Sequence, residues 1–442
     1  MPAAPIAPAT VDVRAIIDRR GVGGLQKLVL LLGFCIIALE GFDLAVMGFI
    51  VPVLRQQWHV GSHALGGALS AAQFGLVPGA LIAGPLADRF GRKTVVLGSV
   101  SVFGVFTLLT STATSLPMLA LLRFVTGIGV GSVVPNTATL ISEYVPERLR
   151  SLSVSFIICG VAFSSACAGF LAAWIIPAFG WRWLLVIGGL ATLLMIPVLF
   201  VAMPESVRFL VAKHAPAARI RTIIEKLVPG ETTEQSVFVT SLELAGRGET
   251  ALVVSPAYRF GSVMLWLAYF AALFASNTLS NWLPSFIKES GYGFQAAATV
   301  AAFYQLGGVA GALAIGWAMD RRDPHKVPAW AFLASGALFL GLGLAFHSVP
   351  LMLLQAFALG FFLIGAICSV NALPTAYYPT QARATGTCWM HAVGRCGALA
   401  SIFSGAQMLS MGWSADRVFL ALIIAPVVAA SALLAKRRYA AR

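Results

Sequence analysis

Long apolar runs alternate with short polar turns along the whole chain. Each run has about 20 residues, the length that an α-helix needs to cross ~30 Å of hydrocarbon. The pattern therefore predicts an all-α membrane protein with twelve spans, at 25–50, 63–87, 94–112, 117–141, 152–175, 183–202, 260–284, 295–319, 328–346, 351–373, 386–410 and 417–435.

One long polar stretch, 203–259, divides these spans six and six. The expected organisation is a tail at 1–24, a six-helix bundle at 25–202, a central loop at 203–259, a second bundle at 260–435 and a basic tail at 436–442. Apolar residues recur with helical period at 219–227. They favour either an amphipathic helix on the inner leaflet or a simple tether between the halves.

Composition and charge support a membrane protein and set its orientation. Of 442 residues 59% are hydrophobic and 11% charged, against about 25% charged in soluble domains, which excludes a soluble enzyme, a secreted scaffold and a disordered chain. The net charge is +13, and in membrane proteins Lys and Arg collect in cytoplasmic loops. Most of them fall on one side of the spans, and only Arg55, Arg182, Lys288 and Arg417 fall on the other. We therefore expect both termini in the cytoplasm and no nucleic-acid partner.

Two loop motifs indicate that the second half repeats the first. Three residues that end the second span recur 232 positions later: Gly84, Asp88 and Arg89 match Gly316, Asp320 and Arg321. Three residues after the fourth span recur at an offset of 233: Tyr144, Pro146 and Arg150 match Tyr377, Pro379 and Arg383. A parallel repeat of this kind is typical of transporters that bind their ligand near the membrane midplane, between the halves.

Two ionisable residues in the eleventh span, His391 and Arg395, are candidates for ligand binding. A charge in the middle of a span costs at least ~2.5 kcal/mol, so it normally faces a cavity or a partner. Arg395 lies near the midplane, where its donor fork suits bidentate capture of a carboxylate. His391, one turn away, would add a hydrogen bond or titrate. The alternative for both is an internal contact that fixes helix packing.

The first span carries two acids, Glu40 and Asp43, and the fourth carries Arg123. The acids are candidates for proton coupling, because burial shifts carboxyl titration toward physiological pH. Arg123 lies near the periplasmic end of the fourth span, at about the same depth in the membrane as Asp43. If the two pair, Asp43 stays ionised and Glu40 becomes the better proton carrier. The alternative is that both acids are structural counterions.

Amide and aromatic residues in the second half suit an aryl ligand, since rings stack and amides hydrogen-bond to ring hydroxyls. The alternative for the aromatic residues is a place in the core or against lipid, and Gln73 and Asn136 in the first half are weaker candidates. The second-half set comprises Phe274, Asn277, Asn281, Trp282, Tyr304, Gln305 and Asn371.

Residues 84–93 read Gly-Pro-Leu-Ala-Asp-Arg-Phe-Gly-Arg-Lys, which resembles the loop signature of the major facilitator superfamily. The stretches at 123–131, 143–150 and 204–206 are also similar to patterns of that superfamily. The resemblance implies a gate formed by Gly84, Asp88, Arg89, Gly91 and Arg92, with a weaker copy at Asp320 and Arg321. Gly84 would let two helices approach closely, while the charged residues would latch one side shut. The alternative is a basic cluster that only sets topology.

The first span, Ala-Leu-Glu-Gly-Phe-Asp at 38–43, resembles the Asp-Gly-Phe-Asp segment of the aromatic acid:proton symporter family, with Glu40 in place of the first Asp. Residues 394–395, Gly-Arg, resemble that family's basic segment. The resemblance implies a monomeric transporter, without cofactor or metal, that imports a hydroxybenzoate-type acid with protons across the bacterial inner membrane by alternating access. Its expected partners are the acid, protons and membrane lipids.

Other classes of protein remain as alternatives. A proton-driven exporter of drugs or organic acids would share the fold. A membrane-embedded enzyme would need a catalytic cluster at one depth, and the spans suggest none. A non-transporting sensor fits the intramembrane charges less well than a protein that moves a charged ligand.

Overall fold

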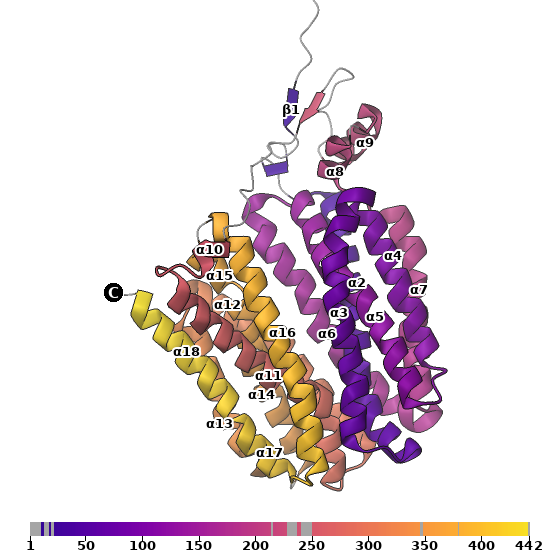
Figure 1. Ribbon diagram of the computed structural model, residues 1–442, viewed down its shortest axis with the longest axis vertical. Helices are drawn as coiled ribbons and strands as arrows, with labels where there is room; N and C mark the ends of the chain where they lie inside the picture. The colour runs from indigo at the N-terminus through magenta and orange to yellow at the C-terminus, as the bar shows by residue number, and fades with distance from the viewer. Residues whose placement is uncertain are drawn as a thin grey trace, which may run out of the picture.

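The computed structural model describes residues 10–12, 17–18, 22–213, 215–227, 237–239, 250–344, 348–378 and 380–440. Its long helices run side by side in two groups (Figure 1). The first half contains α2 (Gly24–Trp58), α3 (Ser62–Phe90), α4 (Arg92–Thr110), α5 (Leu116–Tyr144), α6 (Glu147–Phe179) and α7 (Trp181–Ala202). The second contains α11 (Arg259–Glu289), α12 (Phe294–Arg321), α13 (Lys326–Leu344), α14 (Val349–Val370), α16 (Thr380–Ser410), α17 (Ala415–Leu422) and α18 (Ile424–Ala440).

Each predicted span falls on one of these helices, except that the last is divided between α17 and α18. Ten helical stretches of the described chain are long and apolar enough to cross a membrane. The helices outlast the apolar runs: α2 continues through Pro52 and the polar residues after it to Trp58. Helix length is set by backbone hydrogen bonding and packing, so a hydropathy pattern marks only its apolar middle.

The packing of the helices repeats between the halves. The pairs α3–α5, α2–α6 and α4–α7 in the first half correspond to α12–α14, α11–α16 and α13–α18 in the second. The closest pairs meet at glycines, since a Cβ on Gly75 would lie 2.1 Å from the carbonyl oxygen of Phe124, and one on Gly307 would lie 2.0 Å from that of Phe357. Such glycines let the backbones of the two helices in each pair approach closely.

The halves touch each other mainly near one end of the bundle, which we call the closed end. There α2 packs on α11, α3 on α16 and α6 on α12. A Cβ on Gly48 would lie 2.5 Å from the carbonyl oxygen of Ser280. Closer to the tips, Arg55 of α2 forms an ion pair with Glu289 of α11. These contacts join the two halves at the end where α2 finishes.

The opposite end, which we call the α9 end, carries the short elements (Figure 1). They are α8 (Val207–Ala212), α9 (Ala217–Leu227), α10 (Thr250–Val253), α15 (Leu373–Tyr377) and a parallel pair of strands, β1 (Thr10–Asp12) and β2 (Val237–Val239). The expected tail at 1–24 and loop at 203–259 lie partly outside the described residues, as do 441–442 of the tail at 436–442.

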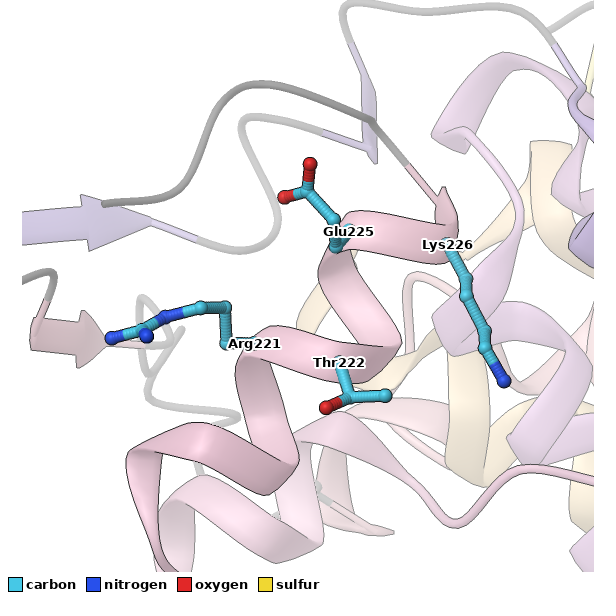
Figure 2. A pocket seen from close by; sticks show the side chains of 4 residues that line it. All are labelled: Arg221, Thr222, Glu225 and Lys226. Atoms are coloured by element: carbon cyan, nitrogen blue, oxygen red, sulfur yellow. The ribbon is translucent and has the colours of Figure 1, made fainter. Parts of the chain in front are cut away.

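Helix α9 corrects one expectation. Its apolar residues Ile220, Ile224 and Leu227 are buried in the core of the first half. The apolar face of this helix therefore packs against protein and not against the inner leaflet. Its polar side chains Arg221, Thr222, Glu225 and Lys226 line a pocket and point in different directions from the helix (Figure 2).

Candidate functional site

A cavity of about 310 Å³ lies between the halves. It is lined by α2, α3 and α6 of the first half and by α11, α12 and α14 of the second. Its volume falls at the lower end of the ~300–1,000 Å³ typical of small-molecule sites. The polar lining comprises Gln73, Ser165, Tyr269, Ser276, Asn277, Ser280, Asn281, Gln305 and Asn371.

Most of the amides predicted from sequence line this cavity. Asn277 and Asn281 lie on α11, Gln305 on α12, and Asn371 directly follows α14. Gln73, the weaker candidate of the first half, faces them from α3. The structure thus brings together side chains that are up to 298 positions apart in the sequence.

The predicted aromatic residues lie behind the lining. Trp282 and Tyr304 are 0% and 1% exposed, and Phe274 packs against the same core cluster. Tyr304 still reaches the site indirectly, because its hydroxyl lies 3.1 Å from the Oγ of Ser276. None of the three lines the cavity as the structure describes it.

Tyr269, Ser276 and Ser280 of α11 also line the cavity, and the sequence did not predict them as site residues. The candidates Phe274, Asn277 and Asn281 follow helical spacing, yet the face that meets the cavity runs through Tyr269, Leu273, Asn277 and Asn281. The spacing of four residues from one polar side chain to the next was the available signal. The phenylalanines of this helix placed the predicted face one position away from the face that lines the cavity.

Arg395 and His391 lie on α16 next to the cavity but do not line it. The phenol oxygen of Tyr269, a lining residue, is 3.4 Å from Nδ1 of His391. A Cβ on Gly394 would lie 2.3 Å from the same tyrosine ring, so α16 rests directly against it. Arg395 has no hydrogen-bond or ion-pair partner among the described residues. A guanidinium at this depth that no carboxylate contacts among the described residues is suited to bind an anion.

Asp43 and Arg123 form a buried pair within the first half. Arg123 Nη1 donates to Asp43 Oδ1 over 2.9 Å, and Thr107 of α4 donates to the same oxygen over 2.6 Å. Asp43 and Arg123 therefore pair, which was the condition for choosing Glu40 as the proton carrier. The Asp43 carboxylate thus accepts hydrogen bonds from a guanidinium and from a hydroxyl, and the first of these is charge-assisted.

Glu40 lies one turn before Asp43 on α2 and is 5% exposed. Its Oε2 is buried without a hydrogen-bond partner among the described residues. The charges that act on it are those of Arg395, in the other half, and Asp43. The neighbouring Gly41 lines the cavity, so Glu40 stands beside the site and opposite the free arginine.

The first part of the predicted gate motif makes no cross-half contact among the described residues. Asp88 and Arg89, at the end of α3, are exposed, and Arg89 lies 5.2 Å from the ring centroid of Phe90. A Cβ on Gly84 would meet no atom within 4 Å. The close helix approach expected at Gly84 is therefore wrong for the described conformation.

The second part of the motif joins two other sequence motifs inside the first half. Arg92 Nε is 3.2 Å from Glu143 Oε1, and Ser206 donates a short hydrogen bond to the same carboxylate. Gly91 has φ of 95°, and a Cβ there would lie 2.3 Å from Glu205 Oε2. Glycine is needed here for both reasons. These contacts tie α3, α4 and α5 to the start of α8.

The weaker copy in the second half is built differently. Arg321 stacks on Trp317, 4.3 Å from its ring centroid, and the side chain of Asp320 lies outside the described set. Asp323 instead accepts from Arg437 of α18 over 2.5 Å. Nearby, burial and the positive charge of Lys436 lower the pKa of His325 to about 4. Asp323, an acid that the first copy of the motif lacks, thus holds α18 in place.

Two repeated helical halves with a ligand-sized cavity between them define a secondary transporter. Residues 33–402 match the Major Facilitator Superfamily, and the chain belongs to this superfamily of transporters, which are not enzymes. It is 41% identical to the 4-hydroxybenzoate transporter PcaK of Pseudomonas putida over 97% of this chain and 96% of that protein. It is 40% identical to a gallate transporter of Pseudomonas putida over 98% and 96%.

A solved structure shows the same fold. The partially occluded, inward-open xylose transporter XylE from E. coli superposes with a TM-score of 0.70, covering 92% of this chain and 97% of that chain at 17% identity.

Proposed function

We propose that this protein imports an aromatic carboxylate of the hydroxybenzoate type across the bacterial inner membrane, together with protons. One observation carries the proposal: an amide-lined cavity of about 310 Å³ between the halves lies next to an arginine without a partner among the described residues. The amides suit a hydroxylated ring and Arg395 suits a carboxylate. Relatives about 40% identical over nearly their whole length carry 4-hydroxybenzoate and gallate.

The proposed topology has twelve spans, both termini in the cytoplasm and the basic loops at the α9 end. It places the closed end on the periplasmic side, so the conformation described is open to the cytoplasm. The side on which Lys and Arg collect supports this orientation. The protein would work as a monomer in contact with membrane lipids.

Glu40 is the proposed proton carrier. The ion pair of Asp43 with Arg123 supports this choice, because it leaves Glu40 as the acid of the first span without a described partner. A proton on Glu40 would weaken its attraction to Arg395 and free the guanidinium for the incoming acid. Binding of the anion and protonation of Glu40 would then favour each other.

Alternating access would follow from rocking of the two rigid halves. In the proposed cycle, the contacts at the closed end break while Asp88 and Arg89 engage the other half at the α9 end. His391 would orient Tyr269 at the edge of the cavity. Gly91 and Arg92 would keep the first half rigid while it moves.

Purified protein in proteoliposomes tests the proposal. We expect radiolabelled 4-hydroxybenzoate to accumulate when the lumen is alkaline, and an uncoupler to abolish the accumulation. An exporter of drugs or acids would instead load the lumen of vesicles of inverted orientation when that lumen is acidic. Absence of both transport and exchange of aromatic acids by folded protein would refute the proposal.

A further inference from the structure

The hydrogen bonds of the cavity amides show which of their atoms are left for a ligand. Asn277 Nδ2 donates to the backbone oxygen of Leu273 over 3.0 Å, and Asn281 Nδ2 donates to that of Asn277 over 2.9 Å. Gln305 Nε2 donates to the hydroxyl of Ser280 over 3.1 Å. Only the amide nitrogen can donate to a carbonyl oxygen, so the first two contacts fix how each carboxamide is turned.

These contacts leave the cavity rich in hydrogen-bond acceptors. In the contacts of the described residues each of the three amides uses one of its two N–H donors, and none of these contacts occupies the lone pairs of its oxygen. Asn371 adds an Oδ1 that is buried without a hydrogen-bond partner among the described residues. Acceptors that are held in place favour a ligand that brings O–H donors.

The described lining also contains no charged residue. A carboxylate among carbonyl oxygens would be repelled and would lose its hydration. The charge of Arg395 acts on both Glu40 and Tyr269, so the nearest cation lies at the edge of the cavity. Asn277 is two helical turns further toward the closed end than Tyr269, a rise of ~12 Å at 1.5 Å per residue.

We infer that the amides of α11 and α12 form a subsite that recognises ring hydroxyl groups, with Asn281 and Gln305 as its specificity-determining residues. The ligand lies with its hydroxylated edge toward the closed end and its carboxylate toward Arg395. The site therefore selects hydroxylated aromatic acids over the unsubstituted acid and over its methyl ether. This inference rests on the proposed function and adds to it a direction of binding and a reason for selectivity.

Calorimetric titration of the purified full-length protein with three acids tests the inference. The acids are 4-hydroxybenzoate, benzoate and 4-methoxybenzoate, which share the ring and the carboxylate but differ in their O–H donor. One satisfied hydrogen bond is worth about tenfold in affinity. We expect 4-hydroxybenzoate to bind about tenfold more tightly than either of the others.

A matched pair of variants assigns the effect. In Asn281→Leu the preference should fall to about twofold, through weaker binding of 4-hydroxybenzoate at unchanged affinity for benzoate. The control is Asn136→Leu, because Asn136 Nδ2 also donates to a carbonyl oxygen of its own helix over 2.9 Å but lies outside the cavity lining. This control should keep the preference of the wild type.

The outcomes separate this inference from the proposed function. Equal binding of all three acids by the wild type would overturn the hydroxyl subsite and leave aromatic-acid transport standing. A loss of preference in Asn136→Leu as large as that in Asn281→Leu would also overturn it. Failure of folded protein to bind any of the three acids would refute the proposed function, and the subsite with it.

Discussion

Arg123 and Asp43 are joined across 2.9 Å in the interior of the first half, where their side chains are 1% and 2% exposed. The pair links the middle of α2 to α5, and the hydroxyl of Thr107 extends it to α4. The pair lies among the packed helices of the first half and does not line the cavity between the halves. Its disruption should therefore affect stability before it affects ligand binding.

Asp43→Asn should destabilise the protein strongly. Removing one partner of a buried ion pair costs ~3–5 kcal/mol, because the remaining charge loses its compensation. We expect a lower unfolding temperature in detergent, measured by intrinsic fluorescence. The double replacement Asp43→Asn with Arg123→Gln should be more stable than Asp43→Asn alone, and strict additivity of the two changes would contradict the pairing.

Arg395→Met should behave in the opposite way. The described structure gives Arg395 no hydrogen-bond or ion-pair partner, so its loss breaks no direct contact of the fold. We expect a near-normal unfolding temperature together with loss of 4-hydroxybenzoate binding. Arg123→Met provides the comparison, with lower stability expected from the same substitution. Unchanged ligand affinity in Arg395→Met would exclude the binding role.

Glu40→Gln should separate proton-driven uptake from exchange. A permanently neutral side chain can neither accept nor release a proton, so uptake driven by a pH gradient should fall to background. Exchange of labelled for unlabelled acid across the membrane should remain measurable. The exposed Asp416, changed to Asn, is a control that should keep both activities. Full gradient-driven uptake by Glu40→Gln would show that another group carries the proton.

His325 should make stability depend on pH at the α9 end of the second half. The pKa of His325 is lowered from 6.5 to about 4 by burial and by Lys436, so between these values the unfolded chain binds a proton that the folded chain does not. Stability therefore falls as the pH drops through this window. We expect His325→Gln to lose less thermal stability than the wild type between pH 7 and pH 5. The exposed His63, changed to Gln, should follow the wild type.

Gly48→Val should open the closed end. Its Cβ would lie 2.5 Å from the backbone of Ser280 in the other half, which leaves no room for a side chain. Distances between spin labels on α2 and α11 near that end should lengthen in a larger share of molecules. Gly98→Val is the control, since a Cβ there would meet no atom within 4 Å. Identical distance distributions in both variants would refute the assigned contact.

Hydropathy and spacing predict most of the framework and part of the site. The apolar runs locate the helices because each must satisfy its backbone hydrogen bonds inside the membrane, and the offset between Gly84 and Gly316 reveals the repeat. The pairing of Asp43 with Arg123 was foreseeable from depth alone. The depth of a residue in the membrane follows from its distance to the ends of its span. These inferences therefore need no knowledge of how neighbouring helices pack.

Rotation of a side chain about its helix is harder to predict. Asn277 and Phe274 are three positions apart, yet one lines the cavity and the other packs in the core. Gly84 was expected to make a close helix contact, but Gly75 and Gly79 on the same helix make it instead. Which glycine meets a neighbouring helix depends on where the two helices cross. The sequence pattern of one helix does not give that crossing point.

The four charged residues within the membrane core have a consequence for the electrical behaviour of the cycle. With all four ionised, Glu40 and Asp43 balance Arg123 and Arg395, and in that state the empty protein carries no net charge through its moving core. One bound anion with one proton restores the same neutrality, whereas either one alone leaves an excess charge inside hydrocarbon, which is costly. In the proposed cycle, reorientation should thus be electroneutral for the empty and the fully loaded protein. The unfavourable half-loaded forms would prevent leakage of protons or of the acid alone.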